Sequence, residues 1–313
     1  MLKDGHPKTF ASKWKYLTAQ EAMRRTPMLT LGRLLSWRVR CLLHWPATIK
    51  LHDWDLQMFL PPDWRGIAKL TFAFRERYEP ELRFLEQFLA PGMTFVDAGA
   101  CYGTYALAAS KLVGDQGRVI AFEPASRAFR VLQRNISLNG LTNVFAYPLA
   151  LTETKGKACL FHHPNVGCDS LGRDHSFTES AEEVPTESLD DVLRAIPVNQ
   201  VDVIKMDVQG AEELVLRGAR TILNSHHPIV IFEIYPEGTI PLGLSPYGAW
   251  EFLDSQGYEF FVADQRRALA RKTSPPTDGN VVAIYKHGSA VSKSIAFAQP
   301  NVTGGLSACF GRV

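Results

Sequence analysis

The sequence predicts an α/β fold with a seven-stranded, mostly parallel sheet, a terminal antiparallel strand and an N-terminal extension. From residue 94 onward, apolar segments of strand length alternate with amphipathic helical segments, as in parallel strands joined by right-handed crossovers. The last two apolar segments, 258–263 and 281–286, follow each other without a long helix, which indicates an antiparallel hairpin. A glycine turn, Gly99-Ala-Cys-Tyr-Gly103, joins the first strand to the first helix, as in folds that bind nucleotides.

The spacing of apolar residues places each element of the sheet. Strands are predicted at 94–98, 118–122, 143–151, 201–208, 228–235, 258–263 and 281–286. Helices are predicted at 102–112, 126–138, 190–195, 211–223 and 247–255. In the second helix Phe129, Leu132 and Ile136 share one face, and Asn139-Gly140 ends it. Residues 155–163 are predicted as an extra strand or hairpin arm, and 164–186 as a polar loop.

The first 90 residues do not continue this alternation. Residues 31–45 carry apolar side chains at helical spacing, 47–61 are predicted as strand, and 81–89 as a helix that leads into the sheet. We therefore divide the chain into three parts. They are an N-terminal extension at 1–78, which is a candidate substrate cap, the main domain at 79–287, and a poorly ordered tail at 288–313.

The amphipathic stretch 31–45 is flanked by arginine and tryptophan and has two interpretations. Such a helix can lie on a membrane or cover a lipid-linked acceptor. An amphipathic stripe is more often packed on its own protein, and the sequence by itself favours this second interpretation.

Composition and charge argue against several classes of function. The 313 residues have a formal net charge of +2, which gives no support for nucleic acid as a partner. The five cysteines are never spaced as Cys-x-x-Cys, so we predict neither a zinc site nor a disulfide framework, and no other metal. The first residues lack the apolar core of an export signal, and no stretch is long and apolar enough to span a membrane. We expect a cytoplasmic protein.

Two acids distinguish the ligands that the glycine turn could bind. Asp97 is in the first strand, and Glu123 ends the second, where a carboxylate can accept hydrogen bonds from both hydroxyls of an adenosine ribose. A nicotinamide dinucleotide carries two phosphate charges. The turn that binds it typically contains a third glycine, which this turn lacks. S-adenosylmethionine has no phosphate and carries a sulfonium and an ammonium group. Asp97 therefore favours S-adenosylmethionine, with a nicotinamide-dependent oxidoreductase as the alternative.

The chain also resembles a known family, the FkbM family of S-adenosylmethionine-dependent methyltransferases, over residues 78–286. The segments that carry the resemblance are "FVDAGACYGTYAL", "VIAFEP", "NVFAYPLAL" and "VIKMDVQGAEELVLRGARTIL", in this order. The resemblance implies the Rossmann-like class I methyltransferase fold. It also implies the activity that is common in the family, O-methylation of a hydroxyl on a sugar, glycan or secondary metabolite.

The resemblance further implies which residues hold the methyl donor. They are Glu79, Asp97, Gly99, Ala100, Tyr102, Gly103, Glu123, Pro124, Ala150 and Leu151. Among them, Glu123 takes the ribose, Ala150 and Leu151 border the adenine, and Glu79 stands where the family often has an acid that leads toward the pocket.

A hydroxyl acceptor needs a group that takes up its proton. Asp207, at the end of the fourth strand, is the leading catalytic candidate, with Lys205 two residues earlier on the same face. Glu233 is also a candidate, because a carboxylate within a buried strand is costly unless it is paired. It is expected to meet Lys205 or Asp207 across adjacent strands and to be held there in a structural ion pair. The other candidate bases are His162, His163 and His175, each more simply explained as a surface histidine.

Two departures from the family pattern affect the site. Cys101 and Tyr102 stand where the family often has asparagine and a small apolar residue. Gln209 stands where the family commonly has a glutamate, in the block Asp207-Val-Gln-Gly-Ala-Glu212. Gln209 cannot serve as a base, so a non-catalytic relative that only binds the cofactor is a further alternative. Glu212 is expected to cap the helix that follows.

Overall fold

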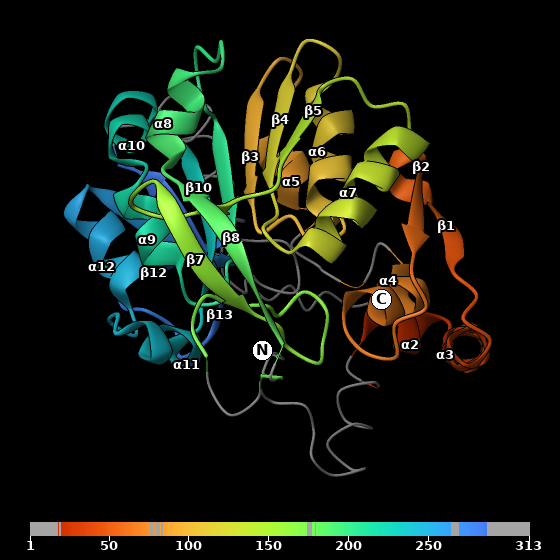
Figure 1. The fold of residues 1–313 in the computed structure, drawn as a ribbon. Helices are drawn as coiled ribbons and strands as arrows, with labels where there is room; N and C mark the ends of the chain where they lie inside the picture. The colour runs from red at the N-terminus through yellow and green to blue at the C-terminus, as the bar shows by residue number, and fades with distance from the viewer. Residues whose placement is uncertain are drawn as a thin grey trace, which may run out of the picture.

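The computed structural model describes residues 18, 20–75, 78, 82, 84–173, 177–178, 180–263 and 269–286. Glu79, His175 and the predicted tail at 288–313 lie outside these residues. Within the described part, an eight-stranded sheet runs in the order β12-β11-β13-β10-β9-β3-β4-β5, with helices on both faces (Figure 1).

Seven of these strands are the predicted ones. They are β3 (Thr94–Ala98), β4 (Arg118–Phe122), β5 (Val144–Tyr147), β9 (Val203–Met206), β10 (Ile229–Ile234), β11 (Tyr258–Ala263) and β13 (Gly279–Tyr285). The first five pair in parallel, and β13 runs antiparallel between β10 and β11. The class I methyltransferase fold is thereby confirmed.

The eighth strand, β12 (Leu269–Lys272), corrects the predicted count. It pairs antiparallel with β11 at the edge of the sheet, within a stretch that the sequence left without structure. Only Leu269 of its four residues is buried, so the strand lacks the apolar alternation by which strands are detected.

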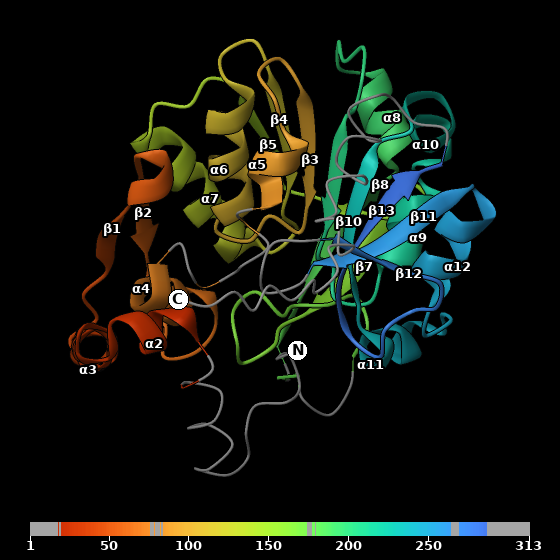
Figure 2. The same cartoon turned by 180° about the vertical axis from the view of Figure 1, so that it is seen from behind.

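Two layers of helices cover the sheet, as Figures 1 and 2 show. One face packs against α5 (Leu85–Phe88), α6 (Thr104–Val113) and α7 (Ser126–Leu138). The other packs against α8 (Leu189–Arg194), α9 (Glu212–Arg217), α10 (Arg220–His226) and α12 (Gly248–Ser255). Within β3, Phe95 contributes to the first core and Val96 to the second, as the alternation of a strand requires.

The predicted helix at 211–223 is divided into α9 and α10. A Cβ atom at Gly218, between them, would lie 2.1 Å from the carbonyl oxygen of Thr152. The backbone at Gly218 therefore lies close to the backbone of Thr152. Any residue with a side chain at this position would collide with Thr152.

The N-terminal extension forms helices around a hairpin. Its elements are α2 (Glu21–Arg25), α3 (Pro27–Leu42), β1 (Ala47–Leu51), β2 (Leu56–Leu60) and α4 (Ile67–Phe74). The predicted strand at 47–61 is therefore two antiparallel strands, joined by a short 3-10 turn, η1 (His52–Trp54). The side chains of Asn135 on α7 and of Asn139, which caps its C-terminal end, accept hydrogen bonds from Phe59 N and Gln57 N of β2, respectively, each at 2.7 Å. These amides hold the hairpin on the main domain.

Asp63 forms a second attachment between the extension and the main domain. Its carboxylate accepts a hydrogen bond from Tyr102 Oη at 2.6 Å and pairs with Arg127, while its carbonyl accepts from Trp37 Nε1 at 2.8 Å. The Asp63 side chain is 7% exposed.

We expect Asp63→Ala to lower the free energy of unfolding by about 2 kcal/mol, because it leaves the buried Tyr102 hydroxyl without an acceptor. Denaturant unfolding measures the change. Tyr102→Phe removes the same hydrogen bond but keeps the pairing of Asp63 Oδ1 with Arg127, and it should cost less. Equal stability of Asp63→Ala and the parent protein would contradict this role.

A smaller sheet lies beyond the ends of the central strands. It consists of β6 (Ala150–Leu151), β7 (Gly156–Phe161) and β8 (Ala181–Glu187), with β8 in the middle. The prediction of a strand near 155–163 is confirmed, but the predicted loop at 164–186 was wrong at its end, where β8 forms. The sequence of β8, AEEVPTE, has few apolar residues because most of its side chains are exposed or half-buried.

Two short elements, α11 (Pro236–Thr239) and η4 (Ile240–Leu242), complete the described structure after β10. No helix in the described part of the chain has the length and apolar character needed to cross a bilayer.

Candidate functional site

The glycine turn after β3 forms the floor of the site. Gly99 has a positive φ of 80°, and a Cβ atom there would lie 2.1 Å from the carbonyl oxygen of Asp207. A residue with a side chain would push the turn away from the end of β9. Gly99 therefore lets two strand ends meet, and this contact brings Asp207 next to the turn.

Two pockets open at the carboxyl ends of the central strands, where open α/β sheets bind their ligands. The first pocket lies over β4 and the loop after β5, and its lining includes Phe122, Glu123, Leu149, Asp169 and Asp207. The second pocket lies between the turn and α4; its main residues are Ile67, Leu70, Tyr105, Val166, Lys205 and Asp207. The two pockets share Gly99, Cys101, Gly167 and Asp207.

The first pocket is acidic at its polar positions. Glu123, Asp169 and Asp207 line it, and among the described lining residues there is no lysine, arginine or histidine. Its remaining walls are largely apolar, from Phe122 and Leu149 among others. This donor set fits a cationic ligand that carries ribose hydroxyls and a flat apolar ring. It does not fit a pyrophosphate, which would meet three carboxylates.

Glu123 is buried at the mouth of the turn. Its Oε2 accepts a hydrogen bond from Cys101 N at 2.7 Å, and its Oε1 accepts from Ala125 N at 2.8 Å. Burial raises the pKa of this carboxyl to about 7, although the two backbone hydrogen bonds act in the opposite direction. The carboxylate is thus held rigidly, with lone pairs left for a ligand.

Asp207 and Lys205 lie together at the end of β9. Lys205 Nζ is 3.9 Å from Asp207 Oδ2 and 3.4 Å from Asp97 Oδ1, and it is 4.7 Å from the ring centre of Tyr105. The Lys205 side chain is 8% exposed, and that of Asp207 is 31% exposed. The ammonium group of Lys205 therefore neutralises part of the negative charge of both carboxylates. Of these two carboxylates, Asp207 lines the pockets and Asp97 is not among the described lining residues.

The loop after β9 fixes the carboxylate of Asp207. Gln209 Nε2 donates a hydrogen bond to Asp207 Oδ1. Glu212, fully within the protein, accepts from Val208 N at 3.1 Å and from Gly210 N at 3.0 Å. Glu212 thus holds the loop that precedes α9, and burial raises its pKa to about 8, with the negative charge of Glu233 adding to the rise.

The structure separates the sequence-predicted donor residues into two groups. Those that line a pocket are Gly99, Ala100, Glu123, Pro124, Ala150 and Leu151. Asp97, Tyr102 and Gly103 are not among the described residues that line either pocket. Asp97 is fully buried, and its Oδ1 lies 3.4 Å from Lys205 Nζ. Tyr102 instead binds Asp63, and Gly103 packs against Leu132.

Of the catalytic candidates, Asp207 and Lys205 come together, as described above. Lys205 lies within ion-pair distance of Asp97 and Asp207. Glu233 lies half-buried on β10 opposite Asn280 of β13, and it is not among the described residues that line the two pockets.

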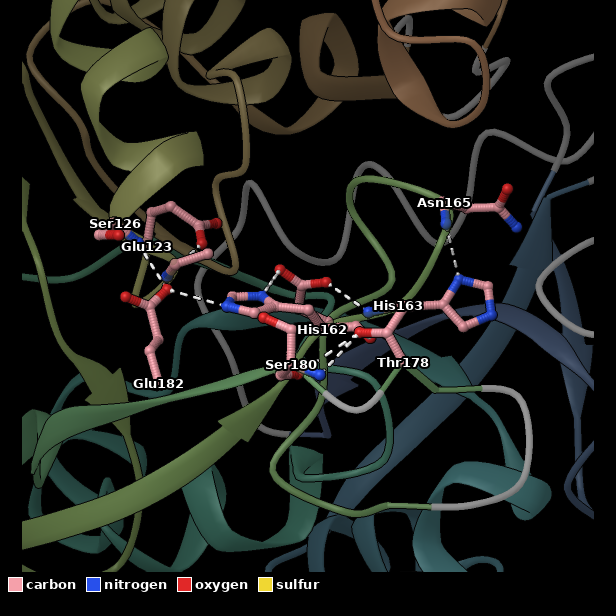
Figure 3. A network of polar contacts seen from close by, with 10 residues as sticks. Glu123, Ser126, His162, His163, Asn165, Thr178, Ser180 and Glu182 are labelled. Atoms are coloured by element: carbon pink, nitrogen blue, oxygen red, sulfur yellow. Dashed lines mark hydrogen bonds and ion pairs between the residues drawn. The ribbon is translucent and has the colours of Figure 1, made fainter.

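Two of the candidate histidines lie in a polar network beside the first pocket (Figure 3). His162 Nδ1 is 3.0 Å from Asp169 Oδ2, and His162 Nε2 is 3.6 Å from Glu182 Oε1. His163 N donates to the other oxygen of Asp169 at 2.9 Å. These histidines orient Asp169 and do not line either pocket as described.

Asp169 is the site residue that sequence reasoning missed. It lies in the predicted polar loop, which has no periodicity to indicate which side chain turns inward. The contacts that bring the loop over the pocket are tertiary: Ser170 Oγ donates to the carbonyl of Gln209 at 2.9 Å, and Val166 forms a bridge with Gly66.

Comparisons with known proteins show which family the chain resembles. The family model described as "Methyltransferase FkbM domain" matches residues 97–260. "Methyltransferase sdnD" of Sordaria araneosa is 29% identical over 181 residues, which cover 48% of this chain and 68% of that protein. "Methyltransferase 1" of Beauveria bassiana is 29% identical over 142 residues, or 39% of this chain and 57% of that protein.

The solved structure of methyltransferase FkbM from Methylobacillus flagellatus KT aligns with a TM-score of 0.40 and 15% identity. The alignment covers 70% of this chain and 53% of that chain. This chain thus spans little more than half the length of that structure and of the Beauveria protein.

Proposed function

Because the chain belongs to the FkbM family of S-adenosylmethionine-dependent methyltransferases, we propose that it methylates a hydroxyl group of a small molecule or glycan, with Asp207 as the general base. The alternative of a nicotinamide-dependent oxidoreductase is wrong, since the family is that of a methyltransferase. The acidic lining of the first pocket also opposes a dinucleotide.

The position of Asp207 carries the proposal. Among the described residues it is the charged one that lines both pockets. A carboxylate at this junction can accept a proton from a hydroxyl in the second pocket while the hydroxyl oxygen faces the first. General bases placed in this way contribute typically about 10²–10⁴-fold to the rate.

The donor site consists of residues whose chemistry suits the cofactor. Glu123 would hold the ribose, and Asp169 and the apolar walls would surround the rest of the adenosine. S-adenosylmethionine supplies a methyl group that its sulfonium activates for attack. Since the methyl group is already activated, orientation of the two reactants is the main task of the protein, and it can contribute up to about 7–11 kcal/mol.

The acceptor side is formed partly by the N-terminal extension. Ile67 and Leu70 of α4 line the second pocket opposite Lys205 and Asp207. This supports the role of residues 1–78 as a substrate cap. An acceptor that places an apolar portion against α4 and a hydroxyl near Asp207 would match both ends of this pocket.

Calorimetry and a methyl-transfer assay test the proposal. In calorimetry, we expect S-adenosylmethionine to bind and NADH not to bind. In the transfer assay, we expect labelled methyl groups to appear on the hydroxyl groups of molecules in a fraction of a cell extract. Donor binding without any methyl release across sugar, polyketide and lipid-linked hydroxyl acceptors would favour a non-catalytic relative. Methyl transfer only to nitrogen or carbon would contradict the choice of a hydroxyl.

A further inference from the structure

We propose that the outer face of α3 binds the surface of a bilayer that contains anionic lipids. Five apolar side chains form this face, here called the outer stripe: Met28, Leu31, Leu35, Val39 and Leu42. They are 82%, 39%, 66%, 47% and 67% exposed, respectively. Their spacing of three, four, four and three residues places them along one side of the helix, which lies at the periphery of the molecule in both views (Figures 1 and 2).

The opposite side of α3 is fixed to the protein, so the outer stripe cannot turn inward. Trp37 is 1% exposed and donates to the carbonyl of Asp63, and Cys41 is equally buried. Arg33 donates from the same side to the carbonyl of Ala73 at the end of α4. The sequence favoured packing of this amphipathic helix on its own protein, but that packing uses a different face from the apolar stripe.

The charge around the outer stripe complements an anionic surface. Between residues 22 and 52 the chain has five arginines, no aspartate or glutamate, and one lysine, Lys50, which pairs with Asp55 at 2.6 Å. Arg38 is exposed on α3 next to Val39, and Arg24 and Arg25, at the end of α2, are exposed just before α3 begins. Trp45, which is 60% exposed, extends the apolar surface past the end of the helix. Exposed apolar residues with tryptophan and flanking arginines are typical of helices that lie in the interface of an anionic membrane.

A second copy of the chain is a poorer occupant. Symmetric dimers place the same surface of two subunits against itself. Here that contact would bring Arg24, Arg25 and Arg38 of one copy near the same arginines of the other, without acidic residues of residues 22–52 to pair with them. Lipid phosphates supply the opposite charge and attract basic residues that lie near the surface.

Vesicle sedimentation with the full chain tests the proposal. The protein should sediment with vesicles of phosphatidylcholine mixed with phosphatidylglycerol, much less with phosphatidylcholine alone, and less as salt increases. Leu35→Asp should weaken binding to the mixed vesicles by about tenfold or more, because it replaces an apolar side chain that would be buried in the bilayer with a charged one. Ile240→Asp is the matched control, since Ile240 is 67% exposed in η4, and its binding should equal that of the parent protein.

Three outcomes would overturn the proposal. They are absence of binding to the mixed vesicles, equal loss of binding in Ile240→Asp and Leu35→Asp, and a dimer in light scattering that Leu35→Asp dissociates. Thermal unfolding checks that each variant folds, and the salt dependence of the unmodified protein gives a test that needs no variant. Calorimetry with S-adenosylmethionine is run in parallel, so that failure of vesicle binding and failure of the proposed function are seen separately.

Discussion

Glu123→Gln is expected to weaken the binding of S-adenosylmethionine by about 100-fold while the protein stays folded. The buried carboxylate already accepts hydrogen bonds from Cys101 N and Ala125 N, so its orientation is fixed before a ligand arrives. A glutamine keeps the size of the side chain, but it has one acceptor oxygen in place of two and no charge. Both ribose hydroxyls would then lose a charged acceptor. Titration calorimetry measures the affinity.

The same carboxyl predicts how donor binding depends on pH. Its pKa in the free protein is raised to about 7, so below that value the group is mostly protonated and must release its proton to act as a charged acceptor. Affinity should therefore fall as the pH is lowered through 7, by up to about tenfold per unit. Glu123→Gln should lack this dependence.

Glu182→Gln is the control for the donor site. Glu182 accepts a hydrogen bond from Ser126 N at 2.9 Å near Glu123, but it is not among the described residues that line the pockets. Its substitution should leave affinity within a few-fold of the parent protein. Affinity retained in Glu123→Gln would place the ribose elsewhere.

Asp207→Asn is expected to lower turnover by about 10²–10⁴-fold while donor affinity changes only a few-fold. The amide cannot take up the proton of the acceptor hydroxyl, whereas its size and its position beside Gln209 and Lys205 are kept. Single-turnover assays with saturating donor and acceptor measure the rate of transfer, and calorimetry measures donor binding.

Asp202→Asn provides the matched comparison. Asp202 lies just before the first residue of β9, at the end of the strand away from Asp207, and it accepts a hydrogen bond from Thr94 N at 2.8 Å. It should affect stability and leave turnover per folded molecule nearly unchanged. A loss of donor affinity in Asp207→Asn as large as the loss of turnover would assign Asp207 to cofactor binding.

Gln209 shows why one substitution in a motif is difficult to interpret from sequence alone. Read as a missing base, it argued against catalysis. In the structure its amide donates to Asp207 Oδ1, so it acts on the carboxylate of the leading catalytic candidate. The motif supplied the position, but the direction of the side chain depends on the loop that Glu212 holds.

The sequence by itself determined seven of the eight strands of the central sheet, the glycine turn, the family and the cofactor, because buried strands and their turns leave local patterns of apolar residues and glycines. It also indicated Glu123 and Asp207, since the ends of parallel strands meet at one edge. Only the tertiary structure decided that Asp169 lines the first pocket, that Asp97 pairs with Lys205 and Tyr102 binds Asp63, and which face of α3 stays exposed. These features depend on contacts between segments far apart in the chain, such as Ser170 with Gln209 and Tyr102 with Asp63, and such contacts leave no periodic signal in either segment.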